Sequence, residues 1–150
     1  MNLVIGIGTY DHGDDAAGLL VAERVRAATS PRTVTVRELV GDQLELLDLW
    51  AGAREVYVID AVRSGAPPGT VYRFDGADYL TSHFAGDSTH ALGLADVVGL
   101  ARALGDLPPR LVGYGITGTL WRPGDPMSPQ VTDAVEVVAR RLCLELRVGA

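Results

Sequence analysis

Residues 3–18 constrain the fold of this chain more than any other stretch of its sequence. They begin with a short apolar run rich in β-branched side chains, pass through closely spaced glycines, and reach Asp14 and Asp15 at the start of a helical pattern that extends to about Ala28. Such a run predicts a buried parallel strand. Because ligands of open α/β sheets bind where such strands end, we expect the functional site at this turn.

Two other interpretations apply to the same residues. An aspartate at a helix start is, taken singly, more often a cap, which stabilises the helix by about 0.5–2 kcal/mol. Gly6 and Gly8 could also open a nucleotide-binding turn, but Asp11 stands where a dinucleotide fingerprint needs its third glycine. Aspartates at the helix start also repel phosphate, and no Gly-Lys-Ser or Gly-Lys-Thr motif is present. We therefore exclude nucleotide binding and expect this helix start to favour a cation.

The rest of the chain alternates between strand and helix patterns. Further strands are predicted at residues 33–36, 56–59, 70–74 and 111–116, and further helices at 41–52, 90–104 and from 128 onward. This order predicts a single α/β domain over residues 1–150, a three-layer α/β/α sandwich. The strand at 70–74 follows its predecessor without a helix, so it is antiparallel or lies at an edge. The polar stretch 75–89 is long for a connection, which indicates a functional loop.

Composition excludes several classes of protein. A formal net charge of −6 argues against a nucleic-acid surface, and no apolar run approaches the roughly 20 residues of a membrane span. Cys143 is the only cysteine, so we expect no disulfide within the chain and no thiolate metal cluster, and we predict a small core residue there. The first residues lack a basic region and a cleavage site, so we expect no signal peptide and a cytoplasmic location.

Asp15, Asp60 and His90 form the candidate site. Asp15 follows the first strand, Asp60 closes the third, and His90 begins a helix, so all three are expected at the edge where the strands finish. Two carboxylates and an imidazole suit a borderline divalent metal, and a helix N-terminus favours the neutral imidazole that can ligate. Each residue also has an ordinary explanation, since Asp60 could cap a turn and a loop histidine is usually solvated. Only geometry can decide between these.

Three segments, in this order, resemble the hydrogenase maturation endopeptidases. They are Gly6-Ile-Gly8 with Gly13-Asp14-Asp15-Ala-Ala-Gly18, then Ile59-Asp60-Ala61, then His90-Ala-Leu-Gly-Leu-Ala-Asp96. Those enzymes remove a C-terminal extension from the large-subunit precursor of nickel–iron hydrogenases after nickel has been inserted. The resemblance spans nearly the whole chain. It implies a mostly parallel five-stranded sheet with one antiparallel strand.

The resemblance also implies a mechanism and a partner. The family's nickel-recognising residues fall on Asp15, Asp60 and His90, which makes these the expected catalytic and metal-binding residues. Nickel would arrive with the hydrogenase large-subunit precursor, so the chain is expected to have no tightly bound cofactor of its own and to be monomeric when free. Either the metal or a carboxylate could perform the hydrolytic step. Two alternatives stay open: a nickel-dependent escort protein that does not cleave, and a metallohydrolase with a resident metal.

The segment after the second strand departs from the common family pattern. Many members have Gly-Gly-Thr where this chain has Val40-Gly-Asp-Gln-Leu44, which is more similar to the Gln-Leu variant seen among proteases for cytoplasmic NAD-linked hydrogenases. We predict that Asp42 and Gln43 are exposed at a helix start and contact the precursor. A simple cap is an equally good interpretation of Asp42.

The remaining polar residues of the motifs receive structural interpretations. We interpret Asp14 as a cap of the first helix that also braces the turn, and we assign His12 and His83 to solvent-exposed loops. Thr9 stands where the family often has asparagine, and Ile116-Thr-Gly118 replaces an Ile-x-Pro pattern.

Overall fold

The computed structural model describes residues 2–76 and 94–148. In chain order its elements are β1 (Asn2–Ile7), the 3-10 helix η1 (Gly13–Ala16), α1 (Ala17–Ala28), β2 (Val34–Leu39), the 3-10 helix η2 (Gln43–Glu45), α2 (Leu46–Leu49), β3 (Glu55–Val62), β4 (Val71–Asp75), α4 (Leu94–Leu104), β5 (Arg110–Thr117) and α5 (Pro129–Val148). No helix within these residues is long and apolar enough to cross a membrane.

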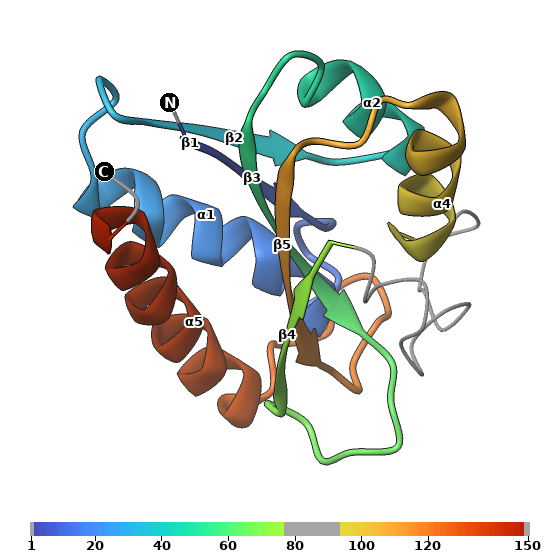
Figure 1. Ribbon diagram of the computed structural model, residues 1–150. Coiled ribbons are helices and arrows are strands. Elements are labelled where there is room, and N and C mark those ends of the chain that lie inside the picture. The colour runs from blue at the N-terminus through green and yellow to red at the C-terminus, as the bar shows by residue number, and fades with distance from the viewer. Residues whose placement is uncertain (1, 77–93, 149–150) are drawn as a thin grey trace.

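The strands form one mixed five-stranded sheet in the order β2-β1-β3-β5-β4 (Figure 1). All neighbours are parallel except β4, which runs antiparallel to β5 at one edge of the sheet. β4, which follows β3 without an intervening helix, is therefore both antiparallel and at an edge. The α/β class and the single antiparallel strand predicted from the sequence are confirmed.

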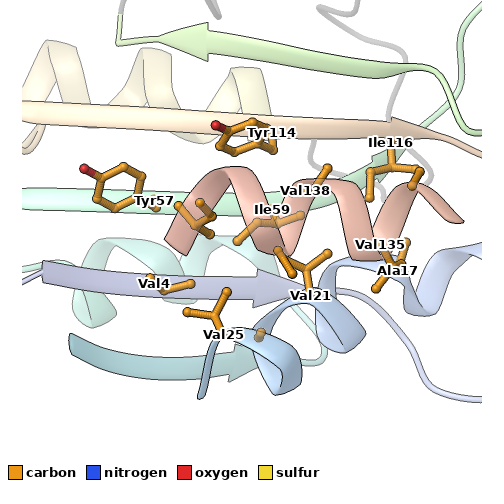
Figure 2. Packing of buried hydrophobic residues seen from close by; sticks show 14 of the residues in the cluster. Val4, Ala17, Val21, Val25, Tyr57, Ile59, Tyr114, Ile116, Val135 and Val138 are labelled. Carbon is orange, nitrogen blue, oxygen red and sulfur yellow. The ribbon is translucent and has the colours of Figure 1, made fainter. Parts of the chain in front are cut away.

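Helices cover both faces of the sheet (Figure 1). On one face, Tyr57 and Ile59 of β3 pack with the apolar sides of α1 and α5, as Figure 2 shows. On the other face, Val56 and Val58 pack with α2 and α4. This alternation follows from the two-residue period of a strand, and the burial of both faces explains why the central strands are continuously apolar. Cys143 on α5 is half-buried against the first of these cores, which fits the small packing residue predicted there.

Gly18 allows α1 to begin directly against the sheet. A Cβ at this position would lie 2.3 Å from the carbonyl oxygen of Ile7 and 2.4 Å from that of Ile59, so a larger residue would push the helix away. The close approach sets the start of α1, and η1 before it, beside the carboxyl ends of β1 and β3. The two neighbouring aspartates are thereby placed at the edge where ligands of parallel sheets bind.

Two predicted element boundaries were wrong. Asp60 lies inside β3 instead of closing it, because the strand continues to Val62 and stays paired with β5 up to Thr117. The helix predicted at 41–52 is a 3-10 turn followed by a single helical turn over Leu46–Leu49.

Candidate functional site

Asp60 is the most unusual residue at the carboxyl edge of the sheet. It lies on a central strand between β1 and β5, and its side chain is 4% exposed. Burial raises the pKa of Asp60 well above the ordinary value of 3.8, and the nearby negative charge of Asp15 raises it further. Hydrogen bonds from Gln43 and from the backbone of Ala61 act in the opposite direction but are weaker. Burial and the neighbouring charge therefore both favour the neutral form of this carboxyl.

Asp15 belongs to η1, in the turn that joins β1 to α1. It is 6% exposed, and its backbone is held by two hydrogen bonds, from the N–H of Thr9 to its carbonyl and from its own N–H to the carbonyl of His12. His12, predicted in a solvent-exposed loop, is half-buried in this turn, with Nδ1 3.0 Å from the Tyr10 carbonyl oxygen. The turn therefore presents the Asp15 carboxyl from a fixed backbone, close enough to Asp60 for their charges to interact.

The predicted third member of the site lies outside the described residues. His90 falls in the segment 77–93, as does His83, and so does most of the loop predicted at 75–89. Within residues 2–76 and 94–148, no group of three or more histidine, cysteine, aspartate or glutamate side chains is arranged to hold a metal ion. The structure thus brings together two of the three predicted ligands, and their metal-binding and catalytic roles stay predictions.

Asp14 has a different role from its neighbour. Its fully buried carboxylate accepts hydrogen bonds from the backbone N–H groups of Thr119 (2.8 Å), Leu120 (3.0 Å) and Ser128 (2.7 Å) and from the Ser128 hydroxyl (2.7 Å). The loop packs so closely that a Cβ at Gly118 would lie 2.6 Å from the Cβ of Asp14. These four donors all lie on the loop between β5 and α5, and among the described residues the N-terminus of η1 has no side-chain cap, so the predicted helix cap was wrong. Asp14 braces that loop against the turn.

The residues before α2 separate into one exposed and one buried side chain. Asp42 is exposed, and its carboxylate accepts a hydrogen bond from the N–H of Leu44 at 2.9 Å, which makes it the N-cap of η2. Gln43 is only 1% exposed, so the prediction that it lies on the surface was wrong. Its Nε2 donates a hydrogen bond to Oδ2 of Asp60 at 3.3 Å.

A signal for this inward orientation was present in the sequence. Gln43, Leu46 and Trp50 are all buried, and they are spaced three and four residues apart, which is the helical pattern of one buried face. The polar character of Gln43 suggested surface exposure, but its place in this series indicates the interior. The residue that sequence reasoning missed is therefore a direct partner of Asp60.

Comparisons with known proteins agree with this architecture. The model of the family described as hydrogenase maturation protease matches residues 20–145. The chain is 26% identical to the hydrogenase 2 maturation protease of Escherichia coli, over 97% of this chain and 90% of that protein. It is 32% identical to the hydrogenase expression/formation protein HupD of Thiocapsa roseopersicina, over 76% of this chain, and it spans only about half of that protein's length (52%).

The fold is also found in solved structures. The hydrogenase maturating endopeptidase HybD from Escherichia coli superposes with a TM-score of 0.85, at 23% identity, over 99% of this chain and 93% of that one. This likeness concerns the fold, whereas the family match rests on the sequence over most of the chain. The chain therefore belongs to the hydrogenase maturation protease family, a family of peptidases.

Proposed function

We propose that this chain removes the C-terminal extension of a nickel-loaded hydrogenase large-subunit precursor, and that it recognises the nickel carried by the precursor through Asp15, Asp60 and His90. The observation that carries the proposal is the buried and unneutralised environment of the Asp60 carboxyl. It is a buried carboxyl beside a second carboxyl, and no arginine among residues 2–76 and 94–148 forms an ion pair with it.

A divalent cation would offset the repulsion between these two carboxyls. Two negative charges in a poorly solvated position oppose each other's ionisation, and a cation between them removes that opposition. In addition, Oδ1 of Asp60 is buried and has no hydrogen-bond partner in the described part of the chain. The carboxylate oxygens, together with an imidazole from His90, form the mixed oxygen and nitrogen donor set that borderline metals such as nickel accept.

The two carboxyls then have specific tasks in cleavage. Asp15 and Asp60 bind the cation borne by the precursor and so hold the scissile peptide beside the edge of the sheet. Precursor-borne nickel supplies Lewis-acid chemistry there, by polarising a carbonyl or lowering the pKa of a water. The alternative is that a carboxylate of this pair takes up a proton from the attacking water as a general base.

Precursor selection belongs to the surface beside this site. Asp42 is exposed, and Val40 and Leu44 next to it expose 53% and 39% of their surface. These side chains flank Gln43, which reaches Asp60, so a precursor seated at the carboxyl edge would meet them. We place the reaction in the cytoplasm, since the single cysteine excludes disulfides within the chain and is compatible with a reducing compartment.

Incubation of purified protein with nickel-loaded precursor tests the proposal directly. We expect the mass of the large subunit to fall by that of its extension with the wild-type chain, and to stay unchanged with Asp60→Asn. Asp48→Asn is the matched control, because Asp48 is an exposed aspartate on the neighbouring α2. This variant should cleave the precursor normally. An intact precursor held in a stable complex by the wild-type chain would indicate the escort function instead. Cleavage by a folded Asp60→Asn variant would show that the site is elsewhere.

A further inference from the structure

Gln43 and Asp60 form a buried polar pair that joins two separate elements of the fold. Gln43 begins η2, whereas Asp60 lies on β3, and both side chains are almost completely shielded from solvent. Nε2 of Gln43 donates a hydrogen bond to Oδ2 of Asp60 and so links η2 to β3. A buried glutamine is costly unless its polar groups are hydrogen-bonded.

The pairing leaves two buried oxygen atoms without donors. Oε1 of Gln43 and Oδ1 of Asp60 have no hydrogen-bond partner among the described residues. A buried acceptor left unsatisfied costs about 1–3 kcal/mol, so this arrangement is poor for stability alone. Buried polar groups that remain unsatisfied in a native fold call for an explanation, and a bound ion is one that suits two oxygen acceptors.

We propose that Gln43 is a positioning residue for Asp60, an inference that rests on the proposed function. By donating a hydrogen bond to Oδ2, the amide holds the carboxyl in one orientation. Oδ1, which accepts no hydrogen bond from the described residues, is then the oxygen that binds the cation brought by the precursor. Gln43 therefore serves the chemistry of the site, while the selection of precursors is left to exposed neighbours such as Asp42.

The chemistry of the amide explains why glutamine suits this task. An arginine at this position would form an ion pair with Asp60 and compete with the incoming cation, since it carries a permanent charge. A glutamate would add a third carboxyl beside Asp15 and Asp60 and has no N–H to donate. The neutral amide orients the carboxyl without neutralising it.

The local structure holds Gln43 rigidly in place. Asp42 caps the turn through the N–H of Leu44, and on the inner face Leu46 and Trp50 are buried in the core between the sheet, α2 and α4. The side chain is thus anchored on both sides along the chain. Positioning residues need such support, because a small displacement of a reacting group lowers the rate strongly.

Gln43→Met tests the proposal, because methionine fills a similar volume without hydrogen bonds. With nickel-loaded precursor we expect kcat to fall at least tenfold while KM changes less than threefold. Gln43→Glu, which keeps the shape but cannot donate, should be at least as slow. Glu45→Gln, an exposed change in the same turn, is the matched control and should behave as wild type. Wild-type kcat in Gln43→Met would overturn the proposal, as would a change confined to KM or to the choice of precursor.

A second readout is independent of cleavage. Melting temperatures of Gln43→Met, Asp60→Asn and the double variant should be non-additive, since residues in direct contact couple. Additive shifts would refute the pairing even if the protein cleaves its precursor. Conversely, cleavage by Asp60→Asn together with non-additive shifts would refute the proposed function while the pairing stands, and Gln43 would then hold a structural carboxyl only.

Discussion

Replacing Asp14 by alanine should destabilise the protein more than any other single aspartate substitution at the candidate site. The carboxylate is completely buried and gathers four donors from the loop between β5 and α5. Alanine removes both acceptor oxygens at once. The loop would then lose its attachment to the turn that carries Asp15.

The magnitude follows from how deeply each hydrogen bond is buried. The two bonds from Ser128 are buried, and bonds to a charged group are each worth about 1.5–3 kcal/mol. The bonds from Thr119 and Leu120 are only partly buried, so water replaces them at a lower cost. Allowing for relaxation, we expect Asp14→Ala to lower the free energy of unfolding by about 3–5 kcal/mol. At about 2–4 °C per kcal/mol for a chain of this size, the melting temperature should fall by roughly 6–20 °C.

Urea unfolding followed by tryptophan fluorescence measures this loss, because Trp50 is buried in the core. Asp42→Ala is the control: the same substitution removes one exposed cap bond, worth about 0.5–2 kcal/mol. Well below its melting temperature, Asp14→Ala should still cleave the nickel-loaded precursor, as a brace is not needed for chemistry. If Asp14→Ala is no less stable than Asp42→Ala, or is inactive while fully folded, the structural role assigned to Asp14 is refuted.

Three further predictions concern the candidate site. Asp60→Asn should be at least as stable as wild type at neutral pH. Because the folded-state pKa of Asp60 is raised, wild type loses stability relative to the variant as pH rises from about 3.8 through that raised pKa. A constant difference in unfolding free energy between the two proteins from pH 4 to 9 would contradict this. His90→Ala should abolish processing and His83→Ala should not, as read from the mass of the large subunit; the reverse result would show that the ligand assignment is wrong. Protein purified without chelators should hold less than stoichiometric metal by elemental analysis, whereas one tightly bound zinc or nickel per chain would indicate a resident-metal hydrolase.

Much of the fold could be predicted because its central strands, β1, β3 and β5, are buried on both faces. The run that contains Val56 and Val58 needs no periodicity to be recognised, since helices cover the sheet on both sides. The end of β3 could not be predicted in the same way. Asp60 reads as the polar residue after an apolar run, yet the ladder with β5 continues to Val62, and only the pairing partner determines where a strand stops.

The nearness of Asp15 and Asp60 could be predicted from the sequence, whereas the contact between Gln43 and Asp60 could not. Asp15 and Asp60 were expected together because parallel strands end at one edge, and their charges do interact. Gln43 was placed on the surface because it is polar and lies near a helix start. Its burial depends on a tertiary contact with Asp60, a residue 17 positions away in the chain, and local patterns carry little information about such contacts.

Asp14 and Asp60 differ in their hydrogen bonding more than in residue type or burial, and we use this difference to separate a structural carboxyl from a candidate functional one. Asp14 and Asp60 are both buried, and each lies in a motif that resembles the same family. Both carboxylate oxygens of Asp14 accept hydrogen bonds from the loop between β5 and α5, so this carboxylate needs no further partner. Asp60 accepts hydrogen bonds from two neutral groups, the Gln43 amide and the Ala61 backbone. It also has an oxygen without a partner in the described part of the chain and a neighbouring carboxyl that opposes its ionisation. A proton or a cation would stabilise a carboxyl in that environment, and the nickel-loaded precursor that we propose as substrate would supply a cation.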